Sequence, residues 1–230
     1  MGNRLLKYFL EKFDASAKPL KKPGPVITIS RDFGCSAKLV AARLCEILNK
    51  KSEGGNSKAE WETINKEIIE ESAKELNLNP SKIKEFFNDE QKTIIDEILL
   101  AFLESNYKND FEIKNTISDV VKTFAFQGHK IIIGRGGAAL TQNFKNSIHI
   151  KLFASPDWRV QKIQDKYNIT KEEARKQIID IDKKRQAIRD FFFKKKEDNS
   201  IYDLLINSAS YTVDEIAEII TNAMKLKKIG

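Results

Sequence analysis

One stretch of the sequence combines residue types suited to binding phosphate. Residues 31–38 (RDFGCSAK) follow a β-branched run, 26–30 (VITIS), and precede a helical pattern with Val40, Leu44 and Leu48 on one face. A strand, a glycine-bearing turn and a helix in this order place backbone N–H groups at a helix N-terminus. Unpaired donors and the helix dipole both attract negative charge there. The sequence therefore predicts a phosphate-binding loop, although of a non-standard type.

A second loop places an arginine between glycines. Gly134, Arg135, Gly136 and Gly137 follow the apolar run 130–133 (KIII). Glycines allow a tight turn, and the guanidinium fork of Arg135 can bind a phosphate there. The alternative is that the glycines only permit the turn and that Arg135 is solvated. The residue types alone leave both interpretations open.

The expected strands alternate with helices along the chain. Strands are predicted at 26–30, 130–134, 147–153 and 202–207, where apolar and β-branched residues cluster. Alternation of this kind implies an α/β fold with a parallel sheet flanked by helices on both faces. Ligands of such a sheet bind beyond the carboxyl ends of the strands, which is where both loops should lie.

Helix starts are marked by capping residues. Ser155 before Pro156 predicts one helix start. Two capping boxes predict two more: Thr170 with Glu173, and Thr212 with Glu215. A further helix carries apolar residues at helical spacing, namely Ile113, Ile117, Val120, Val121 and Phe124. The stretch from 60 to about 106 is mostly helical and charged in pattern, so an inserted subdomain is expected over about 60–110.

The bulk composition is that of an ordinary globular domain. The 230 residues are 41% hydrophobic and 32% charged, and no apolar run has the length of a membrane span. Cys35 and Cys45 are the only cysteines, which excludes a disulfide framework and predicts a reducing, cytoplasmic setting. The formal net charge of +7 favours anionic partners but does not choose among them.

The first residues carry Leu5, Leu6, Phe9, Leu10 and Phe13 at helical spacing. We expect residues 1–24 to form a helix and a linker, with the helix packed on the main domain or on a second subunit in a homodimer. A membrane-surface helix is the less favoured alternative.

Three other features predict less. His129 and His149 lie at or in expected strands without a nearby third ligand, so structural roles are expected rather than a zinc site. Cys35 lies near a helix N-terminus, where a thiolate is favoured, but the sequence offers no base for it. The run 191–196 (FFFKKK) could bind nucleic acid, yet a lid helix packed through its aromatic residues explains it more simply, and no specific nucleic-acid partner is expected.

Several motifs in order resemble the cytidylate kinase-like family. The opening ITISRDFGCSAKLVAARLCEIL (27–48) is similar to a family motif close to ITISREFGSGG, and WETINKEII (61–69) resembles a segment that usually has aspartate in place of Asn65. The match continues through IIIGRGGAAL (131–140), IHIKLFASPDWRVQKI (148–163), DKKR (182–185) and IYDLLINSASYTVDEIAEII (201–220). These segments cover most of the chain after residue 25.

The resemblance implies a P-loop nucleoside-monophosphate kinase fold over 25–230, with a helical nucleotide-binding insertion at about 60–110 and a helical lid at about 156–198. It implies transfer of the ATP γ-phosphoryl group to a nucleotide such as CMP, with Mg²⁺ bound through the nucleotide rather than in a protein-only metal site. The donor phosphates would lie on loop residues Arg31, Gly34, Cys35, Ser36, Ala37 and Lys38.

Other residues acquire roles from the same resemblance. Arg135 matches the arginine of a GRD-type motif that contacts the acceptor nucleotide. Asp182 and Arg185 match a D-x-x-R pattern of the lid that also contacts the acceptor. Arg159 matches a lid arginine near the transferred phosphoryl group, so Arg159, Arg185 and Lys38 are the expected catalytic residues.

The loop also departs from a standard Walker A sequence. Counted from Gly34, Ala37 holds the place of the standard lysine and Leu39 that of the magnesium-binding hydroxyl, while Lys38 is one residue late. Ser36 replaces a usual glycine, and Gly136 stands where cytidylate kinases carry aspartate. An alternative therefore stays open: a catalytically degenerate protein of this fold that binds a nucleotide or phosphorylated ligand without phosphoryl transfer.

Overall fold

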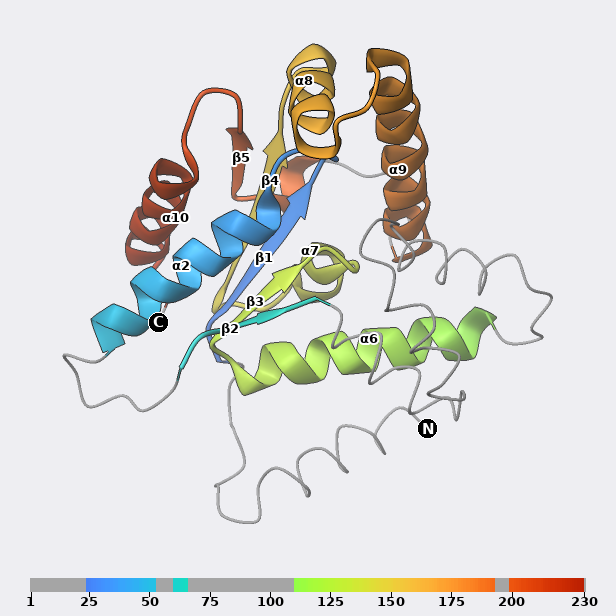
Figure 1. Cartoon of the computed structure of the whole chain (residues 1–230). Helices are drawn as coiled ribbons and strands as arrows, with labels where there is room; N and C mark the ends of the chain where they lie inside the picture. Colours follow the sequence, from blue (N-terminus) through green and yellow to red (C-terminus); the bar gives the residue numbers. More distant parts are fainter. Residues whose placement is uncertain (1–23, 53–59, 66–109, 193–198, 230) are drawn as a thin grey trace.

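Five parallel strands form the centre of the structure (Figure 1). The computed structural model describes residues 24–52, 60–65, 110–192 and 199–229. The strands are β1 (Val26–Arg31), β2 (Glu62–Ile64), β3 (Lys130–Ile133), β4 (Ser147–Phe153) and β5 (Leu204–Asn207), in the spatial order β2-β3-β1-β4-β5. This confirms the predicted α/β class with a parallel sheet.

The central strand β1 is level with its two neighbours. Val26 is paired with Lys130 of β3 and with Ser147 of β4, and Ile29 is paired with Ile133, the last residue of β3. Because the strands run in the same direction, the loops that follow β1 and β3 leave the same edge of the sheet side by side.

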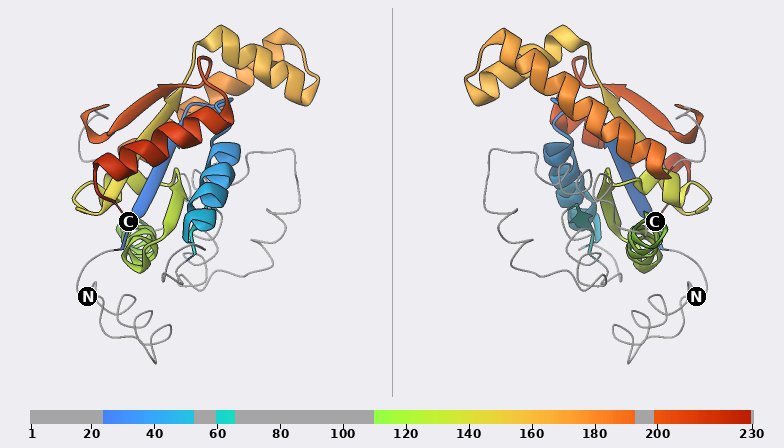
Figure 2. Two further views of the ribbon diagram at one scale, coloured as in Figure 1. Left: turned by 90° about the vertical axis from the view of Figure 1, so that its left-hand side faces the viewer. Right: turned by 90° about the vertical axis from the view of Figure 1, so that its right-hand side faces the viewer.

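Helices cover both faces of this sheet. They are α2 (Ala37–Ser52), α6 (Asp110–Gln127), α7 (Gly137–Thr141), α8 (Pro156–Tyr167), α9 (Lys171–Phe192) and α10 (Val213–Leu226). Helices α2 and α10 pack together over one face, and α6 and α7 lie on the other. Figure 2 shows α8 and the start of α9 at one end of the molecule, beyond the carboxyl ends of the strands, with the rest of α9 running back alongside the sheet toward α7.

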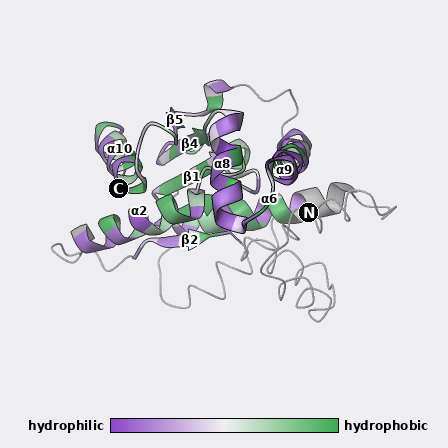
Figure 3. Ribbon diagram, turned by 45° about the horizontal axis from the view of Figure 1, so that its top comes forward, coloured by the Kyte–Doolittle hydropathy of each residue, from purple (hydrophilic) through white to green (hydrophobic). Residues whose placement is uncertain are grey.

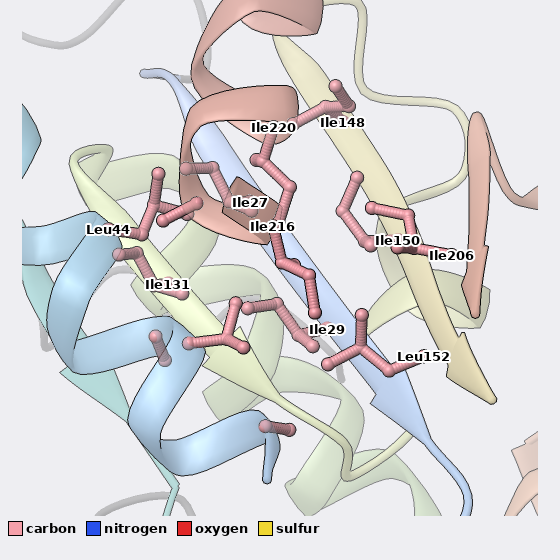
Figure 4. Packing of buried hydrophobic residues seen from close by; sticks show 14 of the residues in the cluster. Ile27, Ile29, Leu44, Ile131, Ile148, Ile150, Leu152, Ile206, Ile216 and Ile220 are labelled. Carbon is pink, nitrogen blue, oxygen red and sulfur yellow. The ribbon is translucent and has the colours of Figure 1, made fainter. Parts of the chain in front are cut away.

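The core is built from the alternating side chains of the strands. Ile27, Ile29, Ile131 and Ile150 are fully buried and pack with Leu44 of α2 between the sheet and its covering helices (Figure 4). Hydrophobic residues accordingly concentrate in the strands, whereas α8 and α9 are largely hydrophilic (Figure 3). The sheet is thus a rigid base, and the outer helices α8 and α9 bring charged side chains to its edge.

The predicted helix caps are present. The Ser155 side chain accepts a hydrogen bond from the Trp158 backbone at the start of α8. Both capping boxes form: Thr212 with Glu215 at α10, and Thr170 with Glu173 before α9. These local signals therefore set where the outer helices begin.

The expectations for the inserted segment need one correction. The stretch from residue 60 was expected to be mostly helical, but Glu62–Ile64 forms the edge strand β2, paired in parallel with β3. The rest of the expected insertion (66–109), the N-terminal helix (1–13) and residues 193–198 of the lid lie outside the described residues. Within the part of the chain that is described, no helix has the length and apolar character needed to cross a bilayer.

Candidate functional site

Four arginines converge on one pocket at the carboxyl edge of the sheet. The pocket is lined by the end of β1, the turn after β3, the start of α7 and the inner face of α9; its lining residues are Ser30, Arg31, Gly134, Arg135, Gly136, Ala138, Ala139, Arg185, Arg189 and Tyr202. None of these described lining residues is an aspartate or glutamate. A pocket with this lining favours an anionic ligand, because guanidinium groups bind phosphate and carboxylate oxygens in pairs.

The position of the pocket follows from the topology of the sheet. Strand β1 leads into α2 on one face, while the neighbouring strand β3 leads into α7 on the opposite face. The chain directions therefore diverge between two adjacent strands, which opens a crevice at their carboxyl ends. Ligands of open α/β sheets bind at such a point.

The turn after β3 has an unusual backbone. Gly134, Arg135 and Gly136 all have positive φ angles, of 72°, 55° and 71°. The two glycines adopt this conformation without cost, whereas Arg135 adopts it against its steric preference. Arg135 is also 9% exposed. Arg135 is therefore buried, not solvated as the alternative interpretation held.

Side chains of α9 contact both strand ends that line the pocket. Phe192 packs against Gly136, where a β-carbon would come 2.6 Å from the ring. Arg185 donates a hydrogen bond from Nη1 to the Arg31 carbonyl oxygen at 3.4 Å, and its guanidinium lies 5.5 Å from the centroid of the Phe33 ring. Helix α9 is therefore docked onto the end of β1.

The loop between β1 and α2, which the sequence predicts to bind phosphate, lies beside this pocket. Gly34 has a φ of 98° and Ser36 a φ of 42°, so Ser36 takes the left-handed conformation that the glycine usual in this position adopts without strain. Cys35 and Ala37 are buried, while Ser36 and Lys38 are exposed. Among the described residues, the structure gives no acceptor to the backbone N–H groups of Gly34, Ser36, Ala37 and Lys38.

The loop is held by two charged residues, Arg159 of α8 and Asp182 of α9. The Phe33 N–H donates to Asp182 Oδ1 at 2.8 Å, and Arg159 donates from Nη1 to the Phe33 carbonyl oxygen at 3.3 Å. Arg159 also forms an ion pair with Asp182. These contacts join α8, α9 and the loop into one unit.

Two titrating groups in the loop are shifted by burial. Burial raises the pKa of the Asp32 carboxyl, and the nearby Asp182 raises it further, while Arg159 opposes the shift. Burial also raises the pKa of the Cys35 thiol to about 11. The expectation of a favoured Cys35 thiolate at the helix N-terminus is therefore wrong, because burial makes the charged form of the thiol costly.

The structure divides the predicted site residues into three groups. Arg31, Arg135 and Arg185 line the pocket. Arg159 of α8 and Asp182 of α9 instead contact the loop after β1. Lys38 is exposed near the start of α2. Sequence reasoning gave Arg189 no role, although its spacing of four from Arg185 places both on one helix face. It also missed Tyr202, for which the sequence offers no signal.

Comparisons with known proteins place the chain in a family. A model of the cytidylate kinase-like family matches residues 26–210. Among curated proteins, no sequence matches.

Several solved structures are similar in fold. An uncharacterized protein from Eubacterium ventriosum is 19% identical, with a TM-score of 0.61 over 87% of this chain and 98% of that one. A shikimate kinase from Acinetobacter baumannii in complex with shikimate is 14% identical, with a TM-score of 0.48 over 92% and 100%. A dephospho-CoA kinase from Campylobacter jejuni is also 14% identical, with a TM-score of 0.36 over 87% and 97%. Identities this low concern the fold alone. Since the family model spans most of the 230 residues, from the first strand to the loop beyond the last, the chain belongs to the cytidylate kinase-like family.

Proposed function

We propose that this chain transfers the γ-phosphoryl group of ATP to a nucleoside monophosphate, a CMP-like one by the resemblance of its motifs. The observation that carries the proposal is the arginine-lined pocket directly beside the phosphate-binding loop. Phosphoryl transfer depends mainly on positioning and on neutralising charge. A second anion site next to the donor loop is what an acceptor that already carries a phosphate requires.

The donor side would consist of the loop and the start of α2. The N–H groups of Gly34, Ser36, Ala37 and Lys38, which the described structure leaves without acceptors, would bind the phosphates of ATP together with Cys35. Lys38 follows the loop in the sequence and Arg159 donates to the Phe33 carbonyl oxygen, so both are candidates for charge stabilisation during transfer.

The acceptor side would consist of the pocket. Arg135 and Arg185 would bind the phosphate of the acceptor, and Arg31, which the sequence assigned to the donor phosphates, lies on the same side as Arg135. Asp182 is assigned to the acceptor by resemblance, although its carboxylate contacts the loop. Gly136 provides no carboxylate to bind a base, so base selectivity would come from other residues than in a GRD-type site.

Mg²⁺ would be bound mainly by the phosphate oxygens of the nucleotide. Magnesium commonly combines substrate phosphates with waters and one or two carboxylates. Asp32, partly buried next to the loop, is the carboxylate that fits this requirement, whereas Leu39 offers no oxygen at the position of the usual hydroxyl. The ion would neutralise phosphate charge there.

A second candidate function is nucleotide binding without transfer. It is favoured by one observation: Ala37, at the place of the standard Walker lysine, is a buried residue without a charge. A protein of this kind would bind ATP or a phosphorylated ligand and respond through its lid.

The two candidates are separated by a coupled assay with Mg²⁺·ATP and a panel of nucleoside monophosphates, alongside calorimetric binding of ATP. Turnover of at least one monophosphate supports the kinase. Binding of ATP with no turnover of any monophosphate contradicts it and supports the second candidate.

Lys38 offers a matched variant for the same assay. Lys38→Ala is expected to lower kcat by about tenfold or more, as loss of a charge next to the transferred group does. Lys50→Ala, at an exposed position near the other end of α2, is the control and should leave kcat unchanged. Equal activity of the two variants would remove Lys38 from the site.

A further inference from the structure

Asp182 makes contacts that its expected role does not explain. One carboxylate oxygen accepts the N–H of Phe33 at 2.8 Å, and the other pairs with Arg159. Arg159 in turn donates to the Phe33 carbonyl oxygen at 3.3 Å. The Asp182 carboxylate thus holds the Phe33 backbone in two ways. It binds the Phe33 N–H directly, and it holds Arg159, which binds the Phe33 carbonyl oxygen.

Apolar packing also joins the loop after β1 to helices α8 and α9. The Phe33 side chain is buried in a cluster with Val160 and Ile163 of α8 and with Ala174, Ile178 and Ile181 of α9. A β-carbon at Gly34 would lie 3.3 Å from the Arg159 β-carbon. The lid and the loop are therefore packed as one body at this point, and Asp182 supplies the polar part of their contact.

Helix α9 presents its charged residues to two different places. Asp182 contacts the loop after β1, whereas Arg185 and Arg189, about one and two turns further along, line the arginine pocket. Asp182 is absent from the described lining of that pocket. Its position is on the donor side of the site.

Arg159 retains binding capacity in this arrangement. Both of its hydrogen bonds described above are made by Nη1. Its Nε is buried and has no hydrogen-bond partner among the described residues. An unsatisfied buried donor is costly to keep. The arrangement is therefore explained if Arg159 is held ready for an anion that reaches the loop.

We propose that Asp182 is a positioning residue of the donor side, which holds Arg159 and the Phe33 backbone in place for the phosphates of ATP. The proposal rests on the function proposed above. Removing Asp182 would take from Arg159 its ion-pair partner and from the Phe33 N–H its acceptor.

Three variants test this role. Asp182→Asn keeps an oxygen for the Phe33 N–H but removes the ion pair, and Asp182→Ala removes both contacts. Asp190→Asn is the matched control, because Asp190 is exposed on the same helix and accepts only from Gln186 Nε2, at 2.7 Å, in the contacts described. Thermal unfolding of each variant shows whether it folds.

We expect the Asp182 variants to weaken the binding of ATP but not that of the nucleoside monophosphate. Asp182→Asn should raise the KM and the calorimetric Kd for Mg²⁺·ATP by about tenfold, the effect of one charge-assisted contact. The KM for the nucleoside monophosphate should change by less than about twofold. Asp182→Ala should also speed amide hydrogen exchange at Phe33 and Gly34, and Asp190→Asn should change none of these quantities.

Other results would overturn the proposal. A rise in the acceptor KM with an unchanged ATP KM would return Asp182 to the acceptor site, and unchanged values for both would remove it from the machinery. If the wild type transfers no phosphoryl group but binds ATP, the proposed function fails, and the ATP Kd of Asp182→Asn still decides the positioning role. A wild type that does not bind ATP would overturn both.

Discussion

The guanidinium of Arg31 packs against Gly134, in the space that a β-carbon at position 134 would need. The two residues are brought together because Arg31 ends β1 and Gly134 follows β3, and these paired strands end at the same edge of the sheet. This contact joins the end of β1 to the arginine turn after β3. A side chain at 134 would push the Arg31 guanidinium aside, and the positive φ of Gly134 independently favours glycine there.

Gly134→Ala should therefore displace Arg31 from the pocket. We expect weaker binding of a nucleoside monophosphate, measured by calorimetry, and a loss of about 1–2 kcal/mol in the free energy of unfolding from alanine in the left-handed region. The control is the double variant Arg31→Ala/Gly134→Ala. If the glycine acts through Arg31, adding Gly134→Ala to Arg31→Ala should weaken binding no further. Additive effects on binding would contradict this relationship.

Arg135→Lys tests the turn itself. Lysine keeps the charge but loses the planar fork that binds two oxygens at once. Loss of such a pair should lower kcat/KM for the acceptor by about tenfold to a hundredfold, with little change in the KM for ATP. Arg175→Lys, at an exposed position on α9, should leave both unchanged. An Arg135→Lys enzyme with normal acceptor kinetics would show that Arg135 shapes the turn without binding the substrate.

The sequence predicted the parts of the molecule that depend on local signals. β1 and β4 and the caps of α8 and α10 were predicted because periodicity and capping act within a few residues. Strand β2 was missed because it has three residues, too few for a pattern, and it exists through its pairing with β3.

The assembly of the site could not be predicted in the same way. Asp182 and Phe33 are 149 positions apart, and Arg185 and Arg31 are 154 apart. Their contacts depend on how α9 folds back over the carboxyl edge, which is set by packing around Phe33. The motifs predicted that Asp182 and Arg185 both belong to the lid. The packing of α9 places Asp182 against the loop and Arg185 in the pocket, which the motifs did not indicate.

Cys35 should be unreactive in the folded protein. It is 1% exposed, and with its pKa raised to about 11 the thiolate fraction at pH 8 is on the order of 0.1%. Alkylation with iodoacetamide at pH 8, followed by mass spectrometry, should modify Cys45 first, because Cys45 is only partly buried. In guanidinium chloride both thiols should react at similar rates. Rapid modification of native Cys35 would mean that the loop opens readily.

The stability of the fold should decrease in mild acid because of His149. This ring lies in the sheet between Thr28 Oγ1, 2.8 Å from Nδ1, and Ser147 Oγ, 3.1 Å from Nε2. The Ser147 hydroxyl donates to the Phe144 carbonyl, so it accepts from Nε2–H, and Nδ1 is left to accept from Thr28. The neutral ring satisfies both partners, whereas a protonated Nδ1 could no longer accept from the Thr28 hydroxyl.

The pKa shift of His149 gives the sign of the effect. Burial lowers the pKa of His149 in the folded chain, with Asp203 opposing and Lys227 adding to the shift. Below the ordinary value of 6.5 the unfolded chain therefore binds a proton that the folded chain does not, and stability is lost as the pH falls.

Denaturant unfolding between pH 7.5 and 5 measures this loss. The free energy of unfolding of the wild type should fall below pH 6.5 by up to about 1.4 kcal/mol per pH unit for this residue. The slope should be smaller in His149→Gln, whatever the absolute stability of that variant. His129→Gln is the comparison, since burial also lowers the pKa of His129 but that ring is partly exposed at the strand end. If His149→Gln kept the full wild-type slope, the acid sensitivity would come from other groups and His149 would tolerate its proton in the core.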